Sequence, residues 1–371
     1  MSRPHDGQRT LFPFGNPFRS ILPKGSNLSP KLRGLLTSFE EALASSMKSL
    51  KPEDISDVLS LSWMGHAIEC LSEAHTNIKT LITDLQFPVS DWDEKWMDIY
   101  LDSSVKLLDI CIALSSELSR LDQGHLSLQY VLHVLDFSNN SPSSEQLKRA
   151  HASLHDWMKQ VDSRSPRLQN CSTILQSLAA SLSLTKVKNS AKGKVLLRAL
   201  YGVKVMTILI CSFLMAALSG SSRPLIELHV TENVLWSEAF KDLQAAISEE
   251  ARRHFSSGKV TAVKELEEIE TYVKRLRVLT CYVGCEEEAI RQSNGISHDA
   301  EVKVMEIDAN HEEQNLLECV SGMSGSAERL RHGLDDLSKQ VGDFFQIVLT
   351  GRDALLCNLR ISDASNMDEN R

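Results

Sequence analysis

The sequence predicts an all-α protein, an elongated multi-helix bundle with coiled-coil-like antiparallel helices and one very apolar central helix. Apolar residues recur at alternating spacings of three and four over several long stretches, the pattern of helices packed nearly parallel. Serine and proline stand where such helices would begin. We find no stretch of useful length in which apolar and polar residues alternate as in a strand. With 371 residues the chain can bury a large core.

Residues 1–27 are expected to form a leader without regular structure, because prolines interrupt its aromatic motif LFPFGNPF. The side chains of Phe12, Phe14 and Phe18 are candidates for docking a partner or a membrane surface. They could equally fold back onto the bundle.

Residues 28–185 are expected to form an amino-terminal helical bundle. Its first helix begins with Ser29 as cap and Pro30 at the first helical position. A second start follows at Pro52, and the seam of this helix consists of Leu61, Met64, Ile68, Leu71, His75, Ile78, Ile82 and Leu85. Because His75 lies within the seam, we expect a core histidine with a hydrogen-bond partner.

A third helix begins after Ser90, and its seam consists of Leu107, Cys111, Leu114, Leu118 and Leu121. The connection to the second helix is short, so the two are expected to form an antiparallel hairpin. Two shorter helices follow, over residues 144–161 and after Pro166.

Residues 186–223 combine a basic approach with the most apolar stretch of the chain. No charged side chain occurs from residue 205 to residue 222. The strongly apolar part, residues 205–218, would rise about 21 Å as a helix, against about 30 Å for the hydrocarbon core of a bilayer. Two interpretations follow: a short helix that inserts into or docks on a membrane, or the innermost helix of a bundle, apolar on every face because neighbours surround it.

Charge is distributed unevenly. The chain carries 40 Lys and Arg against 49 Asp and Glu, yet residues 164–226 hold nine basic and no acidic side chains. This pattern suits contact with anionic lipid head groups; pairing with the acidic carboxy-terminal third is the alternative. The residues expected to contact the membrane are Lys186, Lys188, Lys192, Lys194, Arg198, Lys204, Val205, Ile208, Leu209, Phe213, Leu214 and Leu218.

Residues 224–371 are expected to form an acidic helical region that packs on the bundle. Its longest seam consists of Leu316, Val320, Met323, Ala327, Leu330, Leu334, Leu337, Val341, Phe344 and Val348. We expect this seam to pack within the chain rather than against a second copy, because the earlier helices supply matching seams.

Motifs for catalysis, metals and nucleotides are weak or incomplete. His151 and His155 have metal-ligand spacing but no evident third ligand, and Cys281 and Cys285 lack the two-residue gap of zinc ribbons. The Gly193-Lys194 pair lacks the rest of a phosphate-binding loop. We therefore expect a non-enzymatic protein without metal or cofactor that binds neither nucleotide nor nucleic acid.

Two long segments resemble the BYPASS family of plant proteins. The first segment is SWMGHAIECLSEAHTNIKTLITDLQFPVSDWDEKWMDIYLDSSVKLLDICIALSSELSRLDQGH, and the second is KVKNSAKGKVLLRALYGVKVMT. The leader LFPFGNPF also resembles this family. The resemblance implies a plant developmental regulator needed for normal root and shoot growth, which restrains a root-derived, mobile, carotenoid-related signal that arrests shoot development. Relatives in the wider BYPASS/ROH-like superfamily imply an alternative role as an exocyst-type trafficking adaptor with protein partners.

The location implied is membrane-associated, in the endoplasmic reticulum or endomembrane system, with chloroplast or cytoplasm as alternatives. An acid-poor, Arg-containing amino terminus over residues 1–38 fits plastid targeting, although its prolines oppose an amphipathic helix. A third hypothesis is an enzyme acting on an apolar, isoprenoid-derived metabolite, which rests only on the family's link to a metabolite signal.

Overall fold

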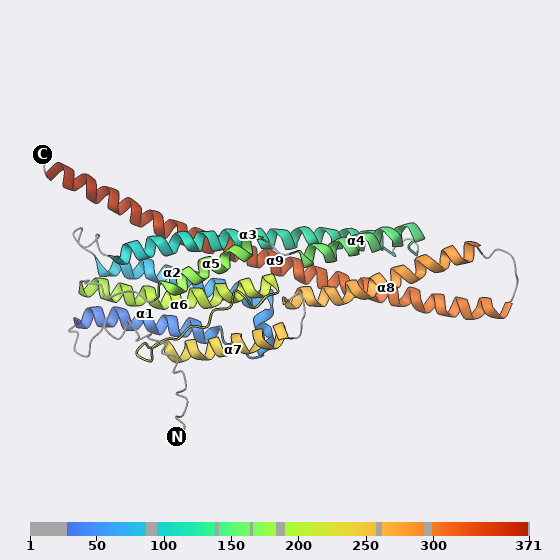
Figure 1. Cartoon of the computed structure of the whole chain (residues 1–371), viewed down its shortest axis with the longest axis horizontal. Coiled ribbons are helices and arrows are strands. Elements are labelled where there is room, and N and C mark those ends of the chain that lie inside the picture. The colour runs from blue at the N-terminus through green and yellow to red at the C-terminus, as the bar shows by residue number, and fades with distance from the viewer. Residues whose placement is uncertain are drawn as a thin grey trace, which may run out of the picture.

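The computed structural model of the chain is an elongated bundle of helices (Figure 1). It describes residues 28–86, 95–137, 141–163, 166–182, 190–256, 262–292 and 299–369. Within these ranges the chain forms nine α-helices and one short 3-10 helix and contains no strand, which confirms the all-α prediction. The helices are α1 (Pro30–Ser49), η2 (Ile55–Leu59), α2 (Leu61–Leu85), α3 (Lys95–Val134), α4 (Ser144–Asp162), α5 (Pro166–Ala180), α6 (Ala191–Ser219), α7 (Ser237–Ser256), α8 (Lys264–Gln292) and α9 (Asp299–Glu369).

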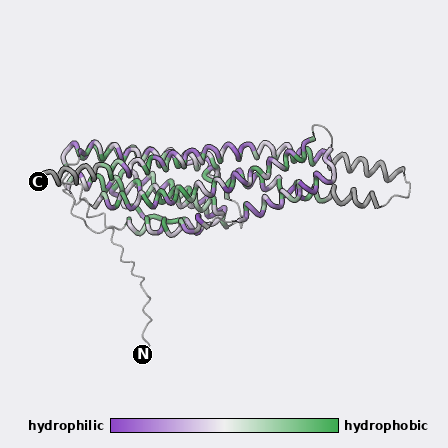
Figure 2. Tube along the Cα trace, turned by 90° about the horizontal axis from the view of Figure 1, so that it is seen from above, coloured by the Kyte–Doolittle hydropathy of each residue, from purple (hydrophilic) through white to green (hydrophobic). Residues whose placement is uncertain are grey.

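The bundle has a broad part and a narrow part. In the broad part α6 lies among α1, α2, α3, α5 and α7, all of which contact it (Figure 1). In the narrow part α4 and α8 pack beside each other. There α4 also contacts the carboxy-terminal half of α3, and α8 contacts the amino-terminal half of α9. Hydrophobic residues gather in the interior of the broad part (Figure 2). The two long helices α3 and α9 join the two parts because both run through them.

The first helix starts where the sequence signals predicted, and the second does not. The start predicted after Ser90 lies outside the described residues. The side chain of Ser29 accepts a hydrogen bond from the Leu32 amide at 3.3 Å, and Pro30 is the first residue of α1, as predicted. The start predicted at Pro52 is wrong, because this proline precedes η2. The helix begins only after Ser60, whose side chain accepts from the Trp63 amide at 3.1 Å.

The predicted α2–α3 hairpin is also wrong. The two helices follow one another in the chain but hardly touch, because α9 packs along both of them. Glycines on α9 permit this close approach: Gly333 lies against Leu61 of α2, and Gly351 lies against Tyr100 of α3. The seams of α2 and α3 therefore both pack against α9, the helix that lies furthest from them in the sequence.

The long seam of α9 packs within the chain, as predicted. Nine of its ten expected residues are buried, and α9 makes its contacts with α2, α3 and α8. His75 of α2 lies between α9 and α6, since its ring stands edge-on to Phe344 of α9 with centroids 5.2 Å apart and its Nε2 lies 3.3 Å from Thr207 Oγ1 of α6. This confirms the core histidine with a partner. Burial lowers the pKa of His75 to about 4.

The glycines of α9 provide a matched test of this packing. A Cβ at position 333 would lie 2.8 Å from Leu61 Cδ1, whereas at position 342 it would meet nothing within 4 Å. We expect Gly333→Ala to lower the free energy of unfolding by about 1–3 kcal/mol through overpacking. Gly342→Ala should raise it by about 0.5–1 kcal/mol, because alanine is the better helix former. Urea unfolding measures both, and equal effects at the two positions would contradict the close α2–α9 contact.

Candidate functional site

The apolar stretch singled out in the sequence is the second half of one continuous helix, α6. Ser190 caps its start by accepting from the Gly193 amide at 3.1 Å, and Gly220 ends it in the left-handed conformation with φ of 58°. At 29 residues the helix is about 43 Å long. Its length and composition are sufficient to cross a membrane.

The apolar half of α6 lies inside the bundle. Of its most apolar 18-residue window, 89% is buried within the fold. The exposure of Val205, Ile208, Leu209, Phe213, Leu214 and Leu218 ranges from 0% to 8%. Phe213 packs edge-on against Trp63 of α2, with ring centroids 5.4 Å apart. Of the two interpretations that the sequence left open, the structure has the buried helix, and lipid could reach these side chains only if the surrounding helices moved apart.

Arg198 has a structural partner that the sequence analysis missed. Its guanidinium reaches the buried carboxylate of Glu40 on α1, with Nε 2.5 Å from Oε1 and Nη2 3.1 Å from Oε2. The same nitrogen Nη2 donates to the Asn233 carbonyl at 2.9 Å, and Glu40 also accepts from the Leu235 amide at 3.2 Å. This cluster joins α6 to α1 and to the segment before α7, so Arg198 is not free to meet lipid head groups.

A signal for this pairing was present in the sequence. Glu40 stands four residues after Leu36 and three before Leu43, so it lies on the apolar face of its helix. A carboxylate in that position needs a cationic partner when buried. The sequence gives no means of choosing the partner, which is 158 residues away.

Lys204 is half-buried beside the end of α5. Its Nζ donates to Ser181 Oγ at 2.6 Å. Burial, and then the nearby charge of Lys106, lower the pKa of Lys204 to about 8, while Asp102 opposes the shift. The Lys204 side chain therefore lies against the bundle rather than against a lipid surface, and its burial disfavours the charged form.

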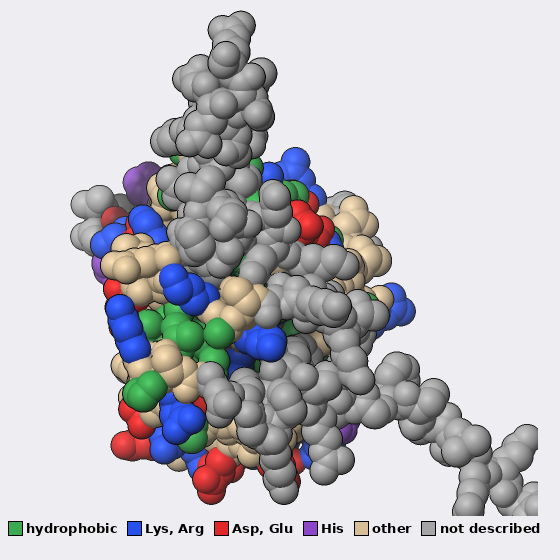
Figure 3. Space-filling model, turned by 90° about the vertical axis from the view of Figure 1, so that its left-hand side faces the viewer, with side chains coloured by type: hydrophobic (Ala, Val, Ile, Leu, Met, Phe, Trp, Pro, Cys, Tyr) green, Lys and Arg blue, Asp and Glu red, His purple; other side chains and the backbone are tan. Residues whose placement is uncertain are grey.

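Lys192 and Lys194 lie at the amino-terminal end of α6 and are partly exposed. Lys192 Nζ donates to the Gln86 carbonyl at the end of α2, at 2.6 Å. On the face of the bundle where α1 and α6 begin, Lys and Arg side chains surround a small apolar patch (Figure 3). The exposed side chains of Lys31 and Arg33 at the start of α1 add to the positive charge there.

The remaining predicted site residues lie outside the described residues: Lys186, Lys188, Phe12, Phe14 and Phe18. For Arg198, Lys192 and Lys204, the partners found come from α1, the end of α2 and the end of α5, besides the Asn233 carbonyl. The alternative in which the basic segment pairs with carboxylates of the acidic third gains no support from these three residues.

The weak metal motifs have ordinary surroundings. His151 Nδ1 lies 3.1 Å from Thr280 Oγ1, which is buried on α8. His155 and Cys281 are exposed. Among the residues that the structure describes, no three His, Cys, Asp or Glu side chains are grouped so that they could hold a metal ion.

The Arg198–Glu40 pair can be compared with an exposed pair. Arg198→Met leaves the Glu40 carboxylate buried, so we expect the free energy of unfolding to fall by about 3–5 kcal/mol. Lys241→Met breaks the exposed pair with Glu232, and its cost should stay within about 1 kcal/mol. Chemical unfolding measures both, and adding Glu40→Gln to Arg198→Met should restore part of the loss. A small effect of Arg198→Met would show that the pair does not join these elements.

The sequence is similar to known plant proteins over nearly its whole length. A family model described as "Protein BPS1" matches residues 84–291, a span that includes all of α6. UPF0496 protein 4 of Oryza sativa subsp. japonica is 51% identical, over 99% of this chain and 98% of that protein. Protein BPS1, chloroplastic, of Arabidopsis thaliana is 46% identical, over 99% and 95%.

A more distant relative is similar over most of the chain. Protein ROH1D of Arabidopsis thaliana is 20% identical, over 89% of this chain and 90% of that protein. No solved structure matches the chain.

Proposed function

The chain belongs to the BPS1 family of plant proteins, as its resemblance to the BYPASS family indicated, and on that premise we propose that it is a non-enzymatic developmental regulator. Membership of the family supports a regulatory role in plant development. In the finer form of the proposal, the protein supports root and shoot growth by restraining a root-derived, mobile, carotenoid-related signal.

We propose further that the protein associates with membranes peripherally, with α6 remaining in the core. The observation that supports this is the burial of the apolar half of α6 next to a basic, exposed end. Burying one large aliphatic or aromatic side chain contributes about 1.5–3 kcal/mol. If α6 left the core for a bilayer, the apolar side chains of the helices around it would become exposed to water. Exposing even six of them would cost about 9–18 kcal/mol, as much as the whole stability of a typical domain. Docking through lysines needs no such rearrangement.

Two locations fit this mode of association. The endomembrane system is the location that we propose first. The name of the Arabidopsis relative, which includes "chloroplastic", supports the plastid alternative. Peripheral docking needs only an anionic surface, so the proposed mechanism does not depend on the organelle.

Two other functions remain as alternatives. An exocyst-type trafficking adaptor is favoured by the elongated shape, because a long bundle can present separate surfaces to a membrane and to a protein (Figure 1). An enzyme acting on an apolar isoprenoid-derived metabolite would need an apolar pocket with converging polar groups. We place it behind the adaptor, because its support is the family's link to a metabolite signal alone.

Lys192 and Lys194, which lie at the basic end of the bundle where α6 begins, test whether this end docks on an anionic membrane. In Lys192→Glu with Lys194→Glu, we expect affinity for phosphatidylserine vesicles to fall at least about 30-fold, because each lysine near an anionic surface contributes about 1 kcal/mol. The matched control is Lys159→Glu with Lys339→Glu, which changes the net charge equally at exposed positions on α4 and α9. Vesicle sedimentation measures the affinities.

The same experiment can contradict the proposal. Unchanged vesicle binding in the double variant at the basic end, or an equal loss in the control variant, would exclude docking through that end. Arg198 is left unchanged because its replacement would disturb the pair with Glu40. Equal unfolding midpoints of the two variants would show that the loss of binding is not a loss of folding.

A further inference from the structure

Helix α3 carries a second seam that faces away from the bundle. Its inward seam, which includes Leu107, Leu114 and Leu121, is buried. On the opposite side, four large apolar side chains of α3 are exposed, although this helix contributes heavily to the core. They are Val105 (43% exposed), Ile112 (46%), Leu126 (60%) and Tyr130 (45%).

The outward residues follow the spacing of a packed helix. Val105, Ile112, Ser119 and Leu126 are each seven residues apart. The residues that alternate with them at spacings of three and four are Asp109, Ser116, Gln123 and Tyr130. None of these eight is fully buried. Single exposed apolar residues are common on protein surfaces, but a heptad array is the pattern that contacts another helix.

This outward seam, residues 105–130 of α3, has a definite size and composition. It extends about 38 Å along the helix. Its middle is polar but uncharged, with Ser116, Ser119 and Gln123 between the apolar ends. Polar residues at such positions select the register of a partner helix through hydrogen bonds, at some cost in affinity.

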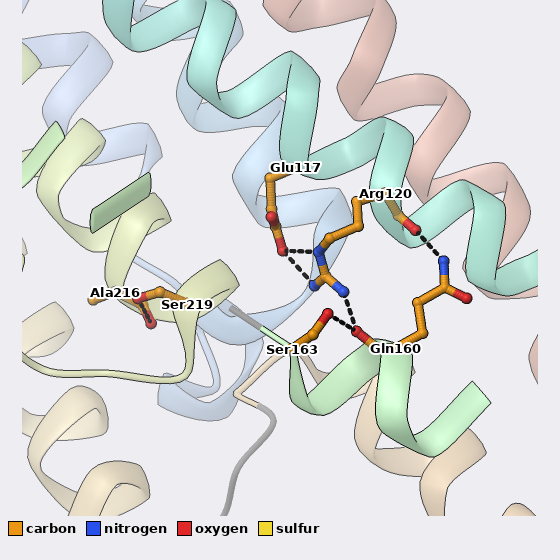
Figure 4. A network of polar contacts seen from close by, with 6 residues as sticks. All are labelled: Glu117, Arg120, Gln160, Ser163, Ala216 and Ser219. Carbon is orange, nitrogen blue, oxygen red and sulfur yellow. Dashed lines mark hydrogen bonds and ion pairs between the residues drawn. The ribbon is translucent and has the colours of Figure 1, made fainter. Parts of the chain in front are cut away.

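Charges along the outward seam are acidic. Asp109 lies in it, and Asp122 is exposed beside it. The basic residues of this part of α3 are neutralised within the chain: Lys106 pairs with Asp102 at 2.7 Å, and Arg120 pairs with the buried Glu117 and donates to the Gln160 carbonyl of α4 (Figure 4). The unneutralised charge at the seam is therefore negative.

We propose that the outward seam of α3 binds an amphipathic helix of a partner protein, with apolar residues on one face and Lys or Arg on both flanks of that face. A second copy of this chain is a poorer occupant, because two such seams would place carboxylates against carboxylates. An anionic membrane is poorer for the same reason. A basic helix complements both the apolar spacing and the negative charge.

A synthetic peptide tests this assignment on the full chain. The peptide has about four heptads, with leucine at the a and d positions and lysine at the e and g positions, so that its copies repel one another. The control peptide has glutamate in place of lysine. We expect the lysine peptide to bind by fluorescence anisotropy, and the glutamate peptide to bind at least tenfold more weakly.

Variants of the chain locate the binding. Ile112→Ser with Leu126→Ser should weaken binding of the lysine peptide at least tenfold. Val278→Ser is the matched control, since Val278 is an apolar residue of α8 with 55% exposure outside the seam, and it should leave binding unchanged. All three positions are exposed, so the unfolding midpoints of the variants should equal that of the parent chain.

Several results would overturn the proposal. These are failure of the lysine peptide to bind, equal binding of the two peptides, or unchanged binding in the Ile112→Ser, Leu126→Ser variant. A dimer in light scattering that this variant abolishes would assign the seam to a second copy. Loss of binding to phosphatidylserine vesicles in the same variant would assign it to lipid.

Discussion

A helix that is apolar on every face must be covered on every side, and this requirement organises the broad part of the molecule. Helix α6 meets it by lying among α1, α2, α3, α5 and α7. These neighbours lie on both sides of α6 in the sequence, so the amino-terminal helices and α7 are parts of one core. The covering helices then expose their polar faces to water.

The two ends of α6 have different surroundings. Its carboxy-terminal half has no charged residue and is buried. Its amino-terminal half carries the basic side chains, of which Arg198 is held by Glu40 and Lys192 reaches a carbonyl at the end of α2. One helix thus supplies both the apolar centre of the bundle and part of its basic end. A membrane surface can contact the basic end without disturbing the apolar centre.

The sequence predicted the helices better than their partners. Periodicity and capping residues located the start of α1 from Ser29 and Pro30, because these signals are local. The predicted α2–α3 hairpin was wrong because the leucine seams of different helices look alike in the sequence. In the structure α2 packs on α9 instead, where Gly333 lies against Leu61. The candidate site shows the same limit: the charge of Arg198 and the apolar surroundings of Glu40 were visible in the sequence, but their pairing across 158 residues was not.

Amide hydrogen exchange over residues 205–218 tests most directly whether α6 is a core helix. The full chain would be measured in buffer without detergent, and again with phosphatidylserine vesicles. If α6 is buried as the structure shows, these amides exchange slowly without lipid, as slowly as global unfolding permits, and the vesicles do not change them. Rapid exchange without lipid, with protection appearing only when vesicles are added, would show that the stretch inserts into the membrane and would contradict this account.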